Sequence, residues 1–311
     1  MNYEMTSPYD CIFHPSFLYK DIWYIVICLM IVSIDGLGQA TGPAETNLTN
    51  HPSSDRYASF SPNGHKIVFE SDREGHWDIY VMDFSGKNLE RLTEHVSDDR
   101  RPSWHPDGES ILFESNRNGS NQLYSISLKD GQIQQLTEIV DGNPIFGAYS
   151  ADGKQIMVSI AKSETEGHIV LLDSNGHVIR SIVENKWRNF YPKWSNEGKD
   201  ILYFSRKDTE NEDDEIYSLD IETGMEVRLT HWPKHNFCPS WSPDDNKIAY
   251  VTSMEASRPE IYIMNNDGTN ATRLTFNDDG DTLPNWSPDG AKLLITAYRN
   301  GNFEIVSLHV H

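Results

Sequence analysis

Five oxygen-bearing side chains recur at regular intervals along this chain. Each stands five residues before an aromatic residue of a repeated block: Asp55, Asp99, Asn189, Asn236 and Asp281. Carboxylate and amide oxygens are ligands that Ca²⁺ prefers, so a ring of them could hold such an ion. Asp and Asn also cap strand starts and bond neighbouring backbone, so a purely structural role stays open. The third copy offers Asn143 and Pro144 at this place.

A second group of side chains could bind a protein or peptide. The segments "WRNFY" at 187–191 and "HWPKHNF" at 231–237 contribute Trp187, Arg188, Phe190, Trp232, His235 and Phe237. Aromatic and arginine side chains dominate binding hot spots, because they bury large areas in well-packed contacts. Packing between neighbouring units is the alternative for some of these rings. Arg100 and Arg101 lead into the second repeat on the same side and could meet an anionic group.

Signals for catalysis are weak. The histidines are scattered, and the chain has no His-Glu-x-x-His metal motif, no Gly-rich phosphate loop and no Gly-x-Ser-x-Gly elbow. A site assembled from distant segments would escape such a search. We therefore predict no catalytic residue, and an enzymatic function stays open.

Composition and charge limit the classes of partner that the protein is expected to bind. The 311 residues include 47 acidic and 26 basic ones, giving a formal net charge of −21. Such a surface repels phosphate backbones, so we expect no nucleic-acid partner.

The N-terminal segment predicts export. Residues 22–34, "IWYIVICLMIVSI", form an apolar run that is short for a membrane span and typical of a signal-peptide core. We predict a signal peptide or membrane anchor over residues 1–40, a periplasmic or secreted location, and membrane contact only through an uncleaved segment. Cleavage after Ala40 would leave Cys238 as the single cysteine, so no internal disulfide is expected.

The chain is built from six repeats. Their blocks are "ASFSPNG", "PSWHPDG", "GAYSADG", "PKWSNEG", "PSWSPDD" and "PNWSPDG". One position of the block falls at residues 61, 105, 150, 195, 242 and 287, which gives spacings of 44, 45, 45, 47 and 45. A sustained period of this length indicates a repeat architecture.

Each repeat reads as four short strands separated by glycine-containing turns. Four-stranded units of about 45 residues are typical of β-propeller blades. The last repeat stops after its third strand, at "FEIVSLHVH", whereas "ETNLTN" at 45–50 resembles the closing "RLT" segment of the other repeats. We therefore predict an all-β fold over residues 41–311. It is a six-bladed propeller of four-stranded antiparallel blades, closed by an N-terminal strand that completes the last blade.

The Trp-Ser-Pro-Asp-Gly block, the Ile-Tyr pair and the Arg-Leu-Thr segment resemble the WD-like repeats of the TolB-type six-bladed propellers. The resemblance implies an exported propeller that often binds another protein or a peptide across its central channel. TolB itself carries an α/β domain ahead of the propeller, and peptidase relatives append an α/β-hydrolase domain. We expect neither domain here.

One face of the predicted propeller varies more than the other. Loops between blades, and loops between the second and third strands, differ in length and content, as binding sites on repeat proteins do. We predict a monomeric protein- or peptide-binding module that uses this face. The alternatives are a small hydrolase or lyase acting on a peptide or carbohydrate at the channel mouth, and a structural element of an envelope assembly.

Repeated charges flank the hairpin of the second and third strands. Acids stand at the start of the third strand, at Asp78, Glu215, Glu260 and Glu304, and arginines end the second, at Arg73, Arg117 and Arg299. We predict that these opposite charges pair across the hairpin.

Overall fold

The structure is a computed structural model, and it describes residues 42–209, 213–254, 258–277 and 279–310. Residues 43–311 form one compact unit. The predicted signal peptide or anchor, residues 1–40, lies outside the described residues. No helix among the described residues is long and apolar enough to cross a membrane.

The described chain folds into 24 strands. The first and second blades contain β2 (Asp55–Phe60), β3 (Lys66–Ser71), β4 (Asp78–Asp83), β5 (Glu90–Arg91), β6 (Asp99–Trp104), β7 (Ser110–Ser115), β8 (Gln122–Ser127) and β9 (Ile133–Gln135). The third and fourth contain β10 (Asn143–Tyr149), β11 (Gln155–Ala161), β12 (Gly167–Asp173), β13 (Val178–Val183), β14 (Asn189–Trp194), β15 (Asp200–Ser205), β16 (Glu215–Asp220) and β17 (Glu226–Arg228). The fifth and sixth contain β18 (Asn236–Trp241), β19 (Lys247–Thr252), β20 (Glu260–Asn265), β21 (Thr272–Arg273), β22 (Asp281–Trp286), β23 (Lys292–Arg299), β24 (Asn302–His309) and β1 (Glu45–Asn47).

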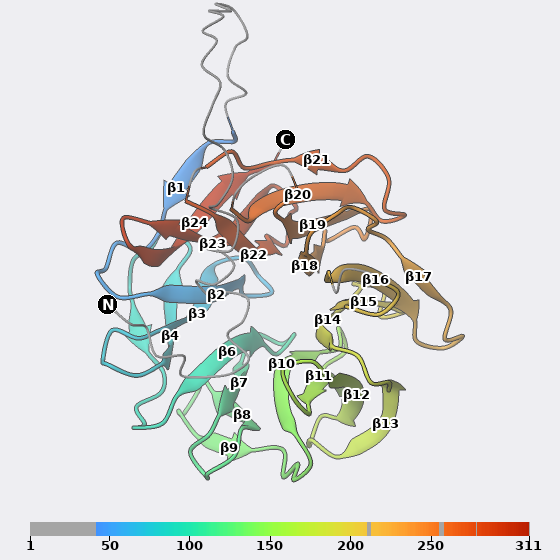
Figure 1. The fold of residues 1–311 in the computed structure, drawn as a ribbon. Helices are drawn as coiled ribbons and strands as arrows, with labels where there is room; N and C mark the ends of the chain where they lie inside the picture. The colour runs from blue at the N-terminus through green and yellow to red at the C-terminus, as the bar shows by residue number, and fades with distance from the viewer. Residues whose placement is uncertain (1–41, 210–212, 255–257, 278, 311) are drawn as a thin grey trace, which may run out of the picture. The chain divides into compact units, whose positions relative to one another are not determined.

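These strands form six separate four-stranded antiparallel sheets arranged around a common centre (Figure 1). The first strand of each blade lies innermost, namely β2, β6, β10, β14, β18 and β22. The predicted six-bladed all-β propeller is therefore confirmed.

The N-terminal strand closes the ring. β1 pairs antiparallel with β24, with Glu45 opposite Leu308 and Asn47 opposite Val306. The ladder continues past β1, because the Leu48 amide donates to the Ile305 carbonyl at 2.9 Å. The predicted closure is confirmed, and it removes two sheet edges that would otherwise be free to pair with another chain.

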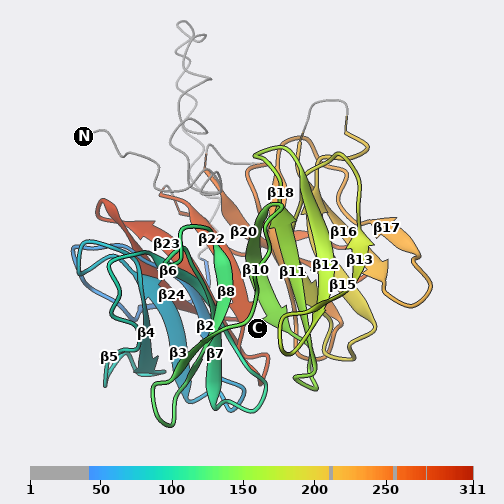
Figure 2. The same cartoon turned by 90° about the horizontal axis from the view of Figure 1, so that it is seen from below.

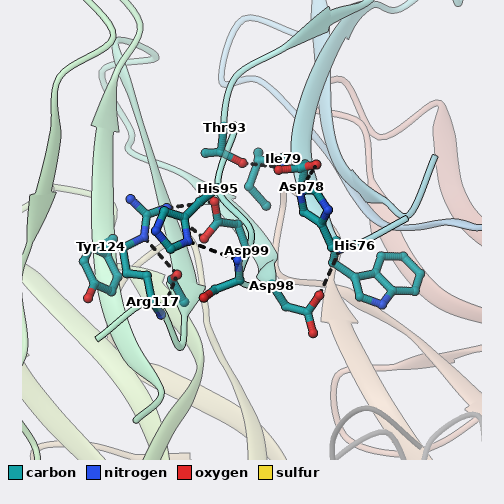
Figure 3. A network of polar contacts seen from close by, with 12 residues as sticks. His76, Asp78, Ile79, Thr93, His95, Asp98, Asp99, Arg117 and Tyr124 are labelled. Carbon is teal, nitrogen blue, oxygen red and sulfur yellow. Dashed lines mark hydrogen bonds and ion pairs between the residues drawn. The ribbon is translucent and has the colours of Figure 1, made fainter. Parts of the chain in front are cut away.

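A threonine hydroxyl anchors the outer segment of most blades. In the first blade the Ile79 amide donates to Thr93 Oγ1 at 3.0 Å, as Figure 3 shows. Thr49 does the same for the Ile305 amide at 2.9 Å, and its hydroxyl donates to Glu304 at 2.7 Å. The segment after β1 thus makes the same threonine hydrogen bond as the outer segment of the first blade.

Every innermost strand contains a bulge at its third or fourth residue, with a residue in the left-handed region. These residues have φ between 48° and 62°, and they are Tyr57, Arg101, Phe146, Tyr191, Cys238 and Leu283. Non-glycine residues seldom adopt this conformation. Hydrogen bonds support it in two blades: the Arg101 amide donates to Glu70 at 2.7 Å and the Phe146 amide to Glu114 at 2.6 Å. A buried acid of one blade thereby stabilises the bulge of the next.

The core lies between neighbouring blades. The block tryptophans link them, because Trp104 Nε1 donates to the Ser59 carbonyl at 3.1 Å and Trp286 Nε1 to the Ser240 carbonyl at 3.2 Å. Apolar side chains of adjacent sheets pack in the same interfaces, for example Phe69 and Tyr80 against Leu294. A residue type that recurs at the same position of the repeats therefore has a structural role in joining neighbouring blades.

Candidate binding face

Strand direction divides the loops between two faces, seen at the two ends of the strands in Figure 2. We call the first the loop face. It carries the segments between blades and the loops that join the second and third strands. The opposite end carries the short glycine turns and is called the turn face. The variable segments of the sequence therefore all lie on the loop face.

Of the eleven large apolar side chains that are exposed among the described residues, five lie on the loop face. Five of the six segments between blades each present one: Val96 (88% exposed), Val140 (98%), Trp187 (37%), Trp232 (44%) and Phe276 (44%). The strand pairing of the repeat does not require these residues, because each lies outside the strands. Together they place apolar groups on the loop face of a strongly acidic protein. The other six exposed apolar residues lie in or beside the outer strands.

The three predicted ring aspartates are fully buried and bound to arginines of their own blade. The bonds are Arg73 to Asp55 (2.8 Å), Arg117 to Asp99 (2.8 Å, Figure 3) and Arg299 to Asp281 (2.9 Å). Each arginine follows or ends the second strand and reaches back to the start of the first. The carboxylates therefore tie the two strands of a hairpin together.

The predicted ring asparagines bond nearby backbone. Asn189 Nδ2 donates to the Gly167 carbonyl at 2.8 Å, and Asn236 Nδ2 donates to the Lys234 carbonyl at 3.0 Å. No group of three or more His, Cys, Asp or Glu residues within the described part of the chain could hold a metal ion. Ca²⁺ binding by the ring of Asp and Asn stays a prediction.

The predicted hairpin pairing of charges is wrong in its partners. The acid at the start of the third strand binds the arginine of the outer strand, as in Arg91 to Asp78 (2.8 Å) and Arg228 to Glu215 (2.7 Å). The arginines of the second strand bind the ring aspartates instead. Registry to the second strand does not select the partner, because Ser71, two residues before Arg73, lies opposite both Asp55 and Asp78. Asp78 is bound instead by Arg91, which lies opposite Tyr80 on the outer strand.

Arg100 and Arg101 belong to a buried charge cluster between the first two blades. Glu70 accepts from Arg100 (3.3 Å) and pairs with Arg56 (3.2 Å), while Arg101 donates to Glu114 (2.7 Å). Buried ions need such partners, because taking them out of water costs several kcal/mol each. These arginines therefore have internal partners, and their predicted contact with an anionic group stays a prediction.

Trp77 completes this cluster. Its ring is buried and lies between two guanidinium groups, with Arg56 at 3.9 Å and Arg100 at 4.9 Å from the ring centroid. The sequence did not single out Trp77. Its position beside two arginine-bearing strands became visible only in the structure.

The predicted aromatic sector divides into a buried and an exposed part. Phe190 is buried and meets Phe204 at 6.3 Å, and Phe204 meets Phe237 at 6.4 Å between ring centroids. These rings pack blades four and five together. Trp187 and Trp232 instead remain accessible on the loop face.

Arg188 and His235 converge on one carboxylate. Asp214 lies 3.9 Å from Arg188 and 3.1 Å from His235, and Arg206 approaches it at 3.1 Å. Burial alone would raise the pKa of Asp214, but Arg188, His235 and Arg206 together hold it well below its usual range. Two predicted binding residues are therefore brought together as supports of the β15–β16 loop.

A pocket of about 350 Å³ lies beside Trp232. Its lining includes Asp208, Asp213 and Glu215 together with Arg228. The exposed Trp232 indole thus borders a pocket on the loop face whose lining is largely polar.

The centre of the propeller contains residues that the sequence did not single out. Tyr57 and Phe146 come from non-adjacent blades, and their ring centroids lie 6.3 Å apart, so they meet at the centre. Nearby, the Lys193 ammonium lies 4.5 Å from the Tyr191 ring centroid. Burial lowers the pKa of Lys193 to about 8. The sequence did contain a sign of this residue, because Lys193 replaces a small residue of the repeated block.

The sheet order and the six repeats define a six-bladed β-propeller with its variable segments on one face. The model of the TolB beta-propeller domain family matches residues 39–209 and 159–311, and the chain belongs to this family.

Several relatives match over part of their length. An uncharacterized protein of Agrobacterium fabrum is 30% identical over 149 residues, covering 48% of this chain and 49% of that protein. The Tol-Pal system protein TolB of Francisella tularensis is 36% identical over 104 residues, covering 33% of this chain and 23% of TolB. The chain thus matches half of the first relative's length or less.

Solved structures share the fold. A TolB candidate from Agrobacterium tumefaciens has a TM-score of 0.61 and 28% identity, covering 68% of this chain and 74% of that one. TolB from Acinetobacter baumannii has a TM-score of 0.62 and 19% identity, covering 83% and 64%. Oligogalacturonate lyase in complex with manganese has a TM-score of 0.57 and 16% identity, covering 88% and 94%. At these last two identities the likeness concerns the fold alone.

Proposed function

We propose that this propeller is an exported module that binds a protein or peptide through its loop face. The observation that carries the proposal is the set of exposed apolar side chains, one on each of five segments between blades. Exposed apolar groups gathered on one surface of a soluble protein mark interaction sites. The apolar run at residues 22–34 supports export.

Two tryptophans are the strongest anchors of this surface. Trp187 and Trp232 are large, exposed and carried by consecutive segments between blades. Tryptophan is enriched in hot spots, because its ring buries much apolar area when a partner covers it. Lys186 lies 5.1 Å from the Trp187 ring centroid and adds a positive group beside it.

The proposal is tested with peptides selected from a displayed random library on the full chain. We expect peptides bound by the wild type to lose about tenfold or more in affinity on Trp187→Ala/Trp232→Ala, since hot-spot truncation costs about 2 kcal/mol or more. Fluorescence polarisation with synthetic copies of the selected peptides measures the change.

The control removes equally exposed apolar groups away from the loop face. Ile133→Ala/Met225→Ala trims the outer part of two blades, and we expect it to leave peptide affinity unchanged. Equal affinity of all three proteins, or equal loss in both variants, would contradict binding through the loop face.

The alternative function is a hydrolase or lyase that acts on a peptide or carbohydrate. Its support is the fold shared with oligogalacturonate lyase. We argue for the binding function, because the exposed apolar surface is an additional observation that the shared fold does not supply.

A further inference from the structure

Three blades share a stacked aromatic pair with a cation over it. Each pair joins the second and third strands: Phe69–Tyr80 at 5.9 Å, Phe113–Tyr124 at 5.7 Å and Tyr203–Tyr217 at 5.6 Å between centroids. A cation lies near each third-strand ring: Arg73 at 4.7 Å, Arg117 at 4.9 Å and Lys207 at 4.4 Å. This arrangement belongs to the repeat.

The third blade keeps the cation and lacks the ring. Val158 pairs with Val170 on β11 and β12, in the register that joins Phe69 to Tyr80 on β3 and β4. Lys162 follows Val158 by four residues, just as Arg73 follows Phe69. The tyrosine of four blades is therefore a valine here, as it also is in the sixth blade at Val306.

A second position beside Val170 carries a long side chain in the first blade and a short one in the third blade. On the outer strand Ser181 pairs with Val170, whereas Arg91 pairs with Tyr80 in the first blade. Both truncations remove volume from the same side of the sheet.

A pocket occupies this region. It measures about 200 Å³, its apolar walls are Ile139, Ile160, Val170 and Val178, and Lys162 and Ser181 belong to its polar lining. An apolar cavity of about 150 Å³ is large enough to bind benzene. The pocket therefore has room for one six-membered ring.

We propose that the pocket beside Val170 in blade three binds a neutral aromatic ring in place of the tyrosine that four other blades supply. The ring packs on Ile160 and Val170, and the Lys162 ammonium interacts with its face. Asp141 holds Lys162, accepting from its Nζ through the backbone carbonyl at 2.7 Å and through the carboxylate. The further carboxylate of Glu184 in the lining favours a neutral ring over an anionic one. This proposal does not depend on the peptide-binding function of the loop face.

The ring could belong to a tyrosine or phenylalanine of a peptide or to a free small molecule. We would titrate the full chain with p-cresol, with N-acetyl-tyrosinamide, and with 4-methylcyclohexanol, which has a similar shape and no aromatic face. Saturation-transfer NMR and calorimetry measure binding. We expect p-cresol to bind more tightly than 4-methylcyclohexanol. Binding of the amide as well assigns a peptide side chain, and binding of p-cresol alone assigns a free aromatic molecule.

Val170→Tyr is the decisive variant, because it rebuilds the ring that four other blades contain. We expect p-cresol to bind this variant at least about tenfold more weakly, while its melting temperature equals or exceeds that of the wild type. Val227→Tyr adds a tyrosine at an exposed outer-strand position and should leave binding unchanged.

Lys162→Met gives a second test if Val170→Tyr folds poorly. We expect it to reduce the affinity for p-cresol to that for 4-methylcyclohexanol. The proposal is overturned if Val170→Tyr binds p-cresol as the wild type does. It is also overturned if p-cresol and 4-methylcyclohexanol bind the wild type equally, or if neither aromatic probe binds at low millimolar concentration.

Discussion

Replacing Glu70 with glutamine is expected to lower the free energy of unfolding by about 3 to 5 kcal/mol, the typical cost of removing one partner from a buried ionic group. Glu70 is completely buried and lies within 3.3 Å of both Arg56 and Arg100. Glutamine has nearly the same shape, so the loss reports the missing charge. Urea denaturation followed by tryptophan fluorescence measures it.

Two further variants sharpen this prediction. Glu74→Gln removes one exposed charge from the same blade, and we expect a change within about 0.5 kcal/mol. The triple variant Arg56→Met/Glu70→Val/Arg100→Met replaces the cluster with apolar groups. It should recover part of the lost stability, because apolar packing often substitutes for buried ion pairs. The recovery stays incomplete, because the Arg101 amide loses Glu70 as its acceptor. Identical denaturation midpoints for Glu70→Gln and Glu74→Gln would show that the cluster does not support the fold.

Thr49→Val is expected to lower the free energy of unfolding by about 1 to 3 kcal/mol, because it leaves the buried Ile305 amide without its acceptor. It also removes one hydrogen bond from Glu304, which keeps the one from Asn302. The hydroxyl of Thr49 donates to Glu304 at 2.7 Å and accepts from the Ile305 amide at 2.9 Å. Thr46→Val changes an exposed threonine of β1, three residues before Thr49, and is the control. Equal stability of the two variants would mean that the Thr49 hydroxyl contributes nothing to ring closure.

The loss in Thr49→Val should depend on pH. Burial raises the pKa of Glu304, and the hydrogen bond from Thr49 opposes that rise. Without the hydroxyl the pKa rises further. A raised carboxyl pKa gives stability below the unfolded value that is lost as pH increases through the folded value. The difference between variant and wild type should therefore be larger at about pH 8 than at about pH 5.

The architecture was predictable because the repeat signals are chemical requirements of every blade. Pro, Asp and Gly specify the turn, and the closing threonine bonds the third strand. Thr49 could be assigned to the last blade from sequence, since the residues around it resemble those around Thr93 and Thr275. The structure shows that its hydroxyl makes the same bond.

The candidate site was less predictable, because side-chain partners depend on registry between strands. The sequence placed Asp55 and Asp99 near a channel mouth but did not indicate that Arg73 and Arg117 reach them. It also gave no sign that residues such as Tyr57 adopt a positive φ, because no glycine marks the bulge. Val170 was different: the aligned third strands contain tyrosine in four repeats, so its departure was already visible.

Ring closure between β1 and β24 also constrains how the protein is made. During synthesis on the ribosome the segment around Glu45 emerges early, while its partner residues near Val306 appear about 260 residues later. At about 5 to 20 residues per second, this strand waits on the order of ten seconds or more without its neighbour. The nascent chain can complete five blades in order, but the sixth blade is complete only when β1, near the N-terminus, pairs with β24, near the C-terminus.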